Sequence, residues 1–265
     1  MKKIAVCGKG GNGKSTVVAL VARELCARSG GVVVVDSDES NAGLYHMLGF
    51  DHPPVPLLEL AGGKKKVQKL MRSSPAAGDQ ERTTSVLQQD QIRLDEIPDR
   101  HVLRRSRLVL VAIGKIHQAL EGCACPMGVL SREFLKRLKL ASDEVALVDM
   151  EAGVEHFGRG VETSLDTVLA LVEPSLESIL LAARIKDLAT GCDVHFAGAV
   201  MNRIPDNSIR ERLASELRAR QLPVLGIIGH HPEIAEAGLV GELPGEGTWT
   251  GEISAVVDAL MTRGQ

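Results

Sequence analysis

The chain has 265 residues, of which 44% are hydrophobic and 25% are charged, so its composition is that of a globular protein and not of a disordered one. Its net charge of −3 argues against a nucleic-acid partner held by bulk charge, because neutralising phosphates requires a basic face. The apolar run Ile4–Cys7 is too short for a signal peptide, and no segment approaches the length of a membrane span. We therefore expect a cytoplasmic protein with no membrane partner.

Short β-rich runs alternate with helix-like stretches through most of the chain. Continuous apolar runs such as Val32–Val35 are typical of strands covered on both faces. The alternation predicts an α/β fold, a doubly wound, mostly parallel sheet with helices on both faces, in which ligands bind at the carboxyl ends of the strands. The predicted strands are Lys3–Cys7, Val32–Asp36, Leu108–Ile113, Val145–Met150, Thr167–Val172, His195–Met201 and Val224–Ile228. The predicted helices include Ser15–Arg28, Val129–Leu138, Leu176–Leu188 and Ser208–Arg220.

The first predicted strand leads into a phosphate-binding loop. Its residues read G-x-x-x-x-G-K-[ST] between a strand and a helix, which is the context that this motif requires. Glycines let successive backbone N–H groups converge on phosphate oxygens, and the following helix adds the partial positive charge of its N-terminus. We predict that ATP binds here, with Lys14 on the β- and γ-phosphates, Ser15 on Mg²⁺ and Thr16 near the α-phosphate. The loop residues expected to bind the nucleotide are Gly8, Gly10, Gly11, Asn12, Gly13, Lys14, Ser15 and Thr16.

Two further strands are followed directly by carboxylates, where Mg²⁺ and an attacking water are held in this kind of sheet. Asp36 ends the second predicted strand and is assigned to the magnesium shell, with a helix-capping role as the alternative. Asp149 follows Val145–Val148 in a Walker B arrangement, which holds Mg²⁺ usually through water, and Glu151 is grouped with it at the nucleotide site. Gly153 offers a backbone N–H that is expected to sense the γ-phosphate.

The segment 62–99 interrupts the alternation of strands and helices. It is polar, with a lysine run at 64–66 and few large apolar side chains between residues 73 and 91. We interpret it as a mobile surface excursion rather than a functional element. No second domain is evident in the sequence, so residues 1–265 are predicted to form a single P-loop ATPase domain.

Cys123 and Cys125 form a Cys-x-Cys pair in a chain with five cysteines. Two thiolates bind one soft or borderline cation but fill only half of a tetrahedral shell. A twofold-symmetric homodimer would bring four sulfurs together. A disulfide of poor geometry and two unligated thiols remain the alternatives. The sequence does not distinguish Ni²⁺ from Zn²⁺, because thiolates accept both.

The phosphate loop resembles the deviant Walker A motif of the family that includes septum-site and plasmid-partition ATPases, arsenite-pump ATPases and nitrogenase iron protein. The resemblance rests on K-G-G-x-G-K-[ST] beginning at Lys9. It implies that Lys9 crosses a homodimer interface to the partner's nucleotide, where a cation stabilises the transferring phosphoryl group; a solvated surface lysine is the alternative. It further implies that Asp38 orients or activates water in a switch I loop, and that Asn202 recognises adenine.

A narrower resemblance covers nearly the whole chain. The Cys-x-Cys segment Glu121–Pro126, together with D-M-E-A-G-V-E-H-F-G-R-G from Asp149 to Gly160, is similar to the carbon monoxide dehydrogenase accessory ATPases of the CooC type. This implies an ATP-hydrolysing homodimer that binds Ni²⁺ or Zn²⁺ through Cys123 and Cys125 and assists nickel insertion into carbon monoxide dehydrogenase or a related nickel enzyme. The alternatives are a positioning ATPase of the septum-site or partition type and an iron–sulfur cluster carrier of the nitrogenase iron protein type.

Overall fold

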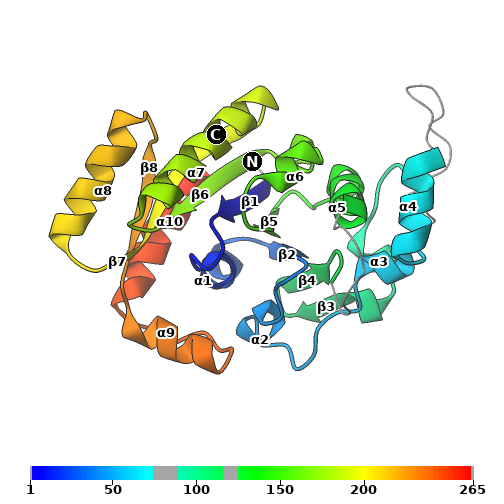
Figure 1. Ribbon diagram of the computed structural model, residues 1–265. Helices are drawn as coiled ribbons and strands as arrows, with labels where there is room; N and C mark the ends of the chain where they lie inside the picture. Colours follow the sequence, from blue (N-terminus) through cyan, green and yellow to red (C-terminus); the bar gives the residue numbers. More distant parts are fainter. Residues whose placement is uncertain (1, 74–88, 116–124, 264–265) are drawn as a thin grey trace.

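The computed structural model describes residues 2–73, 89–115 and 125–263, whose arrangement is shown in Figure 1. These residues contain an eight-stranded sheet in the order β3-β4-β2-β5-β1-β6-β7-β8. Neighbouring strands run parallel, except that β3 and β4 are antiparallel. The predicted doubly wound, mostly parallel sheet is therefore confirmed. The strands are β1 (Lys3–Gly8), β2 (Gly31–Ser37), β3 (Val102–Arg105), β4 (Leu108–Ala112), β5 (Glu144–Met150), β6 (Thr167–Val172), β7 (His195–Ile204) and β8 (Val224–Gly229).

Helices cover both faces of the sheet (Figure 1). On one face α1 packs against α10, with Leu20 and Val257 in a shared core cluster. On the other face α5 and α7 bury Phe134 and Ile185 in a second cluster. The α-helices are α1 (Lys14–Arg28), α2 (Leu44–Met47), α3 (Leu57–Leu60), α4 (Lys64–Ser73), α5 (Cys125–Arg137), α6 (Glu155–Gly158), α7 (Leu176–Gly191), α8 (Asn207–Ala219), α9 (Pro232–Leu239) and α10 (Thr248–Arg263). Short 3-10 turns are η2 (Leu94–Glu96), η3 (Asp99–His101) and η4 (Glu162–Ser164).

Strand β2 shows why the sequence contains a continuous apolar run. Val32 and Val34 pack on the α1 side of the sheet, whereas Val33 and Val35 pack on the side of α5 and α7. Successive side chains of a strand point to opposite faces, so a strand covered on both faces must be apolar at every position. The buried strand then delivers Asp36 to the carboxyl edge of the sheet.

The structure adds an edge strand, β3, that the sequence did not predict. Its residues Arg104 and Arg105 are exposed, and Ser106 turns the chain into β4 with a left-handed φ of 54°. Charged side chains are typical of edge strands, because they discourage pairing with another sheet. These charges hide the apolar pattern on which the strand prediction relied.

Most described residues of the segment 62–99 are exposed or half-buried, but a few apolar ones are buried. Helix α4 buries Val67, and Ile92 and Ile97 are 2% and 5% exposed within the core cluster on the α5 side. Ile92 also forms an isolated parallel bridge with Leu138. The few apolar residues of the segment therefore anchor its two ends on the body of the protein, and residues 74–88 lie outside the described residues.

The last described helix, α10, is part of the core. Trp249, Ile253 and Val257 on this helix are each at most 2% exposed and belong to the cluster formed with α1. Within the described ranges, no helix combines the length and the apolar character that crossing a membrane would need.

Candidate functional site

The phosphate loop joins β1 to α1 at the carboxyl edge of the sheet. Gly8, Gly11 and Gly13 have φ angles of 152°, 75° and 91°, which glycine adopts without strain. A Cβ on Gly8 would lie 2.5 Å from Nδ2 of Asn12, so a larger residue would displace the loop. Helix α1 begins at Lys14 with no side-chain cap. Its first backbone N–H groups are therefore available to bind an anion such as phosphate.

The two lysines of the loop take different directions. Lys14 is 6% exposed, and its Nζ donates a hydrogen bond to the backbone oxygen of Lys9 at 3.1 Å, so its ammonium group lies over the loop. Lys9 extends toward α7, where its Nζ is 2.8 Å from Oε2 of Glu177 and 3.4 Å from Oε1 of Glu173. The hydrogen bond with Glu177 raises the pKa of Lys9. Lys9 is thus held as a cation beside the loop by acidic residues of its own chain.

The predicted carboxylates meet at the ends of β2 and β5, where Asp36 and Asp149 are register partners. Lys115, which follows β4, donates from Nζ to Oδ2 of Asp36 at 2.7 Å and to the backbone oxygen of Asp38 at 2.6 Å. Oδ1 of Asp38 accepts hydrogen bonds from the backbone N–H and the hydroxyl of Ser40 at 2.9 and 2.6 Å. Asp36 is therefore paired with Lys115 and caps no described helix, and its place in the magnesium shell stays a prediction.

Ser15 and Asp149 have the donor set that Mg²⁺ requires. The hydroxyl of Ser15 donates to Oδ2 of Asp149 at 2.6 Å, and Nδ2 of Asn41 reaches both groups at 2.8 and 3.0 Å. Oδ1 of Asp149 is buried and has no hydrogen-bond partner among the described residues. A buried carboxylate oxygen without a partner is costly unless a cation or water binds it. The residues present therefore fit a magnesium ion.

Asn41 and Lys115 were not among the predicted site residues. Asn41 lies three positions beyond Asp38, and Lys115 lies three positions beyond the end of β4. Both follow buried strands at the carboxyl edge of the sheet, where ligand-binding side chains gather. Applying that rule to amide and amino groups as well as to carboxylates would have found them.

Burial disfavours the charged forms of Asp36 and Asp149. Burial raises the pKa of Asp36 to about 6, although the nearby Lys115 ammonium opposes the shift. Burial and the neighbouring Asp36 raise the pKa of Asp149 to about 7. Both groups therefore bind a proton more tightly in the folded chain than in the unfolded chain, whose aspartates titrate at about 3.9. Their contribution to folding stability is favourable at low pH and is lost as the pH rises from about 4 to about 7.

Asp149→Asn is expected to remove part of this pH dependence from the nucleotide-free protein. Relative to the wild type, its free energy of unfolding should increase between pH 4 and pH 7, by at most about 1.4 kcal/mol per pH unit. Urea unfolding at unit intervals from pH 4 to pH 8 measures the difference. The exposed Asp51→Asn is the matched control and should show no such trend. A constant difference between wild type and Asp149→Asn would contradict the prediction.

Strand β5 continues into a second loop that contacts the phosphate loop. Gly153 has a φ of 90°, and its N–H donates to the backbone oxygen of Gly8 at 3.2 Å. Glu151 pairs with Arg159, and burial together with the Glu151 carboxylate raises the pKa of Glu39. Glu151 therefore connects the loop after β2, which carries Asp38, with the loop after β5, which carries Gly153.

Residues in the last part of β6 and β7 hold the phosphate loop from its other side. Nδ2 of Asn202 donates to the backbone oxygen of Asn12, and Arg203 donates to that of Gly11, both at 2.8 Å. Nδ2 of Asn12 donates to the backbone oxygen of Leu171, also at 2.8 Å. Asn202 thus lies at the loop, and its contact with adenine stays a prediction.

The predicted metal ligands are only partly described. Cys125 is half-buried and is the first residue of α5, which begins four residues earlier than the predicted Val129. Cys123 lies outside the described residues. Among the residues that are described, no three histidine, cysteine or acidic side chains are grouped to hold a metal ion. The Cys-x-Cys metal site therefore stays a prediction.

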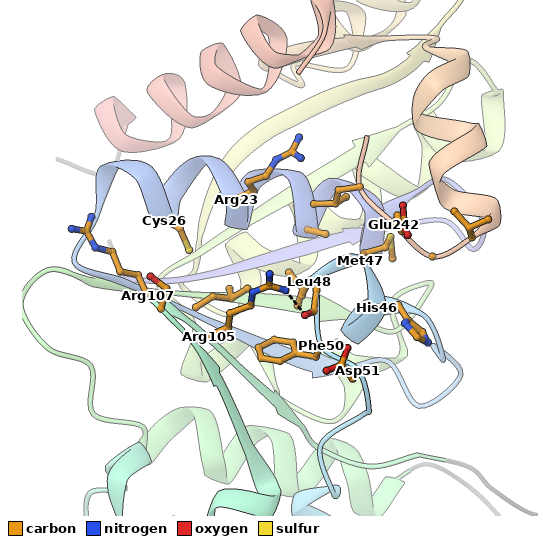
Figure 2. Close-up of a pocket in the computed structure, with 17 residues that line it drawn as sticks. Arg23, Cys26, His46, Met47, Leu48, Phe50, Asp51, Arg105, Arg107 and Glu242 are labelled. Atoms are coloured by element: carbon orange, nitrogen blue, oxygen red, sulfur yellow. Dashed lines mark hydrogen bonds between the residues drawn. The ribbon is translucent and has the colours of Figure 1, made fainter. Parts of the chain in front are cut away.

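A separate cavity of about 1020 Å³ lies between α1, the loop after α2, the β3–β4 turn and residues 240–243 (Figure 2). Two of the arginines that line it, Arg23 and Arg105, make contacts within the protein. Arg23 donates to the backbone oxygen of Pro244 at 2.8 Å and lies over the ring of Trp249, and Arg105 donates to the backbone oxygen of Gly49. The residues that line it include none from the phosphate loop or the strand-end carboxylates. The volume of this cavity is therefore no evidence that it binds the nucleotide.

The family model of the CobQ/CobB/MinD/ParA nucleotide binding domain matches residues 3–244. The chain belongs to this family. The match explains why the phosphate loop and the strand-end carboxylates occur together, and it confirms the predicted ATPase of the deviant Walker A type.

Relatives of this CobQ/CobB/MinD/ParA family member span its length. An ATP-binding protein of Methanocaldococcus jannaschii is 40% identical over 91% of this chain and 92% of that protein. The carbon monoxide dehydrogenase accessory protein CooC of Rhodospirillum rubrum is 32% identical over 90% of this chain and 88% of that protein. The structure of the septum site-determining protein MinD with Mg-ADP from Pyrococcus horikoshii superposes with a TM-score of 0.71 at 17% identity, over 98% of this chain and 95% of that one. This last likeness concerns the fold.

Proposed function

We propose that this ATPase is a homodimeric metallochaperone that works in the cytoplasm without a membrane or nucleic-acid partner. Cys123 and Cys125 bind Ni²⁺ or Zn²⁺ at the dimer interface, and ATP hydrolysis assists nickel insertion into carbon monoxide dehydrogenase or a related nickel enzyme. The observation that carries the proposal is the 32% identity with CooC over about nine-tenths of both chains. The Cys-x-Cys pair and the sequence from Asp149 to Gly160 support it.

At the nucleotide, the proposal assigns each residue a contact. Backbone N–H groups of the loop and of the start of α1 bind the phosphates, and Lys14 exchanges the backbone oxygen of Lys9 for the β- and γ-phosphates. Ser15 and Asp149 would hold Mg²⁺, which neutralises charge on these phosphates when it is bound. Asp38 orients the attacking water, and its hydrogen bonds from Ser40 keep the carboxylate in one orientation.

The proposed homodimer gives Lys9 its role. In one chain Lys9 is paired with Glu173 and Glu177, so it must leave these partners to reach the nucleotide of a second copy. Beside these acids, Leu176 and Leu180 of α7 are 62% and 52% exposed. A second copy that packs on this part of α7 would cover both leucines while Lys9 exchanges one set of acidic partners for phosphate oxygens.

Arg159 supplies a path from the nucleotide to the proposed metal site. Its guanidinium pairs with Glu151, which contacts switch I through Glu39. Its aliphatic part lies against the first turn of α5, where a Cβ on Gly128 would be 2.4 Å from Cδ of Arg159. Cys125 begins that turn. Burial lowers the pKa of Arg159, but the pairing with Glu151 and the nearby Cys125 outweigh burial and raise it. A movement of Glu151 in response to the γ-phosphate would therefore displace the end of α5 that carries Cys125.

Two other functions within this family are less well supported. A membrane-positioning ATPase needs an amphipathic helix that is available to the membrane. Here the apolar face of α10 is buried against α1 and the sheet, with Trp249 and Ile253 at most 2% exposed. An iron–sulfur cluster carrier would use the same four cysteines of a dimer, so it is distinguished by experiment: it is brown when purified without oxygen and contains acid-labile sulfide.

Metal and nucleotide stoichiometry of the purified protein tests the proposal. With ATP present, we expect one Ni²⁺ or Zn²⁺ per dimer and no acid-labile sulfide. The double variant Cys123→Ser/Cys125→Ser should still bind ATP but should retain less than about a tenth of the metal, because serine hydroxyls do not replace thiolates as ligands of these ions.

Cys192→Ser is the matched control, because Cys192 is half-buried like Cys125 but lies at the far end of α7. Its metal content should equal that of the wild type. Full metal occupancy in the double variant would refute the thiolate site. A colourless wild-type protein that binds ATP but takes up neither metal would reduce the proposal to a nucleotide switch without metal cargo.

A further inference from the structure

A buried histidine holds the loop after β5, and neither the proposed nucleotide contacts nor the proposed metal site uses it. His156 on α6 is 2% exposed, and Glu162 on the following 3-10 turn is completely buried. Nδ1 of His156 is hydrogen-bonded to Oε1 of Glu162, and Nε2 lies 3.2 Å from the backbone oxygen of Gly153. The ring therefore bridges a buried carboxylate and Gly153 of the loop after β5.

The two oxygen acceptors define the state of the ring. A carboxylate oxygen and a carbonyl oxygen each require a hydrogen from the nitrogen that faces them, so both ring nitrogens must donate. The imidazolium form satisfies both acceptors at once, and the Glu162 carboxylate balances its charge. Burial opposes the charged ring, but the Cys7 sulfur and Glu162 outweigh it and raise the pKa of His156 to about 10.

Gly153 is consequently held at both of its peptide groups. Its N–H donates to Gly8 of the phosphate loop, and its carbonyl accepts from His156. Between these two contacts the backbone of Gly153 has a φ of 90°, at which a side chain would be strained. A Cβ at this position would also lie 2.3 Å from Oε2 of Glu155. The N–H can turn from Gly8 toward a phosphate by rotation about this single residue, provided that the carbonyl side stays in place.

We propose that His156 is a positioning residue that fixes the carbonyl side of Gly153, so that binding of ATP rotates the Gly153 N–H from Gly8 to the γ-phosphate about a stationary anchor. The proposal rests on the ATPase function inferred above. Glu162 supports this anchor, because its carboxylate accepts the hydrogen bond from Nδ1 of His156. Without the anchor, the whole loop would move and the N–H would reach the phosphate in many orientations.

Two neutral substitutions separate the two contacts of the ring. In His156→Gln the amide nitrogen takes the place of Nε2 and keeps a donor toward Gly153, whereas in His156→Asn it takes the place of Nδ1 and keeps a donor toward Glu162. Both are made together with Glu162→Gln, so that neither leaves a buried carboxylate unpaired. The two double variants therefore differ in which contact is lost while their charge is the same.

Steady-state ATP hydrolysis and ADP binding are the measurements. The Asn variant is expected to lose about 10- to 100-fold in kcat, because a misplaced contact in the transition state costs this much, while KM for ATP and Kd for ADP change less than about threefold. The Gln variant should keep kcat within about fivefold of the wild type. Equal losses in the two variants would overturn the positioning role, because a merely structural histidine does not distinguish them.

NMR of the wild type labelled with ¹⁵N at histidine and glycine keeps the proposal testable if the Asn variant does not fold. The His156 ring N–H signals should remain protected and unshifted when ADP is replaced by a non-hydrolysable ATP analogue, whereas the Gly153 amide signal should move. If the Nε2 proton exchanged with solvent while the analogue is bound, the proposal would be overturned. Failure of the ATPase function itself would be seen separately, as absence of turnover in the wild type.

Discussion

Lys9→Ala is expected to lower the kcat for ATP hydrolysis by about 10³-fold or more, while single chains still bind ATP with nearly unchanged affinity. In the proposed complex the loop, the start of α1 and Lys14 bind the phosphates of the chain's own nucleotide. The side chain of Lys9 instead points to Glu173 and Glu177. Removing it therefore leaves binding intact. What is lost is a cation supplied by the partner to the transferring phosphoryl group.

Turnover, nucleotide affinity and ATP-dependent dimerisation are measured on the same preparations. Lys65→Ala removes an exposed lysine of α4 and should behave as the wild type. Small-angle scattering with ATP should show fewer dimers for Lys9→Ala, because the lysine contributes to the interface as well as to chemistry. Unchanged turnover in the variant, or only single chains in the wild type with ATP and metal present, would remove the role of Lys9 in trans.

Asp38→Asn is expected to lower kcat by about 10²- to 10⁴-fold, which is the usual contribution of a general base or water-orienting group. Asparagine has nearly the same shape, and its side-chain oxygen still accepts the hydrogen bonds from Ser40, so the loop should keep its conformation. ATP binding should persist, and the ATP-bound dimer should accumulate because its hydrolysis is blocked. Rapid-quench measurement of phosphate release, combined with gel filtration in ATP, checks both effects.

Glu39→Gln is the control for Asp38→Asn, since it removes the neighbouring carboxyl group of the same loop. Burial and the Glu151 carboxylate raise the pKa of Glu39, which disfavours the charged form that Gln removes. We expect at most about a fivefold fall in kcat. If Asp38→Asn turned over normally while Glu39→Gln did not, the water-activating group would be Glu39.

Much of the fold could be read from local pattern. Each strand of the parallel sheet was predicted within about three residues at either end, because burial on both faces demands long apolar runs. The edge strand β3 escaped this reasoning, since a strand at the margin of a sheet is only half covered and tolerates arginine. The anchoring of the segment 62–99 escaped it too. A few apolar residues such as Ile92 and Ile97 decide its packing, and their effect depends on what lies beneath them.

In the candidate site, too, some features follow from local sequence and others depend on tertiary contacts. The phosphate loop is local, because its backbone conformation is encoded in consecutive glycines and in the helix that follows. The partners of its side chains are not. Ser15 meets Asp149, 134 positions away, and Asn41 joins them across 108 positions. Nor could a local pattern find the contact of Lys115 with Asp36 or that of Lys9 with Glu177.

By itself, the sequence determined that this chain is an α/β ATPase with a deviant phosphate loop and acidic residues at two strand ends. The tertiary structure decided that Asp36 is paired with Lys115 and that Oδ1 of Asp149 has no hydrogen-bond partner among the described residues, and it placed His156 against Gly153. The physical reason is the order of the strands. Because β5 lies between β2 and β1 in the sheet, residues far apart in the chain share one buried edge, and their charges must be balanced there.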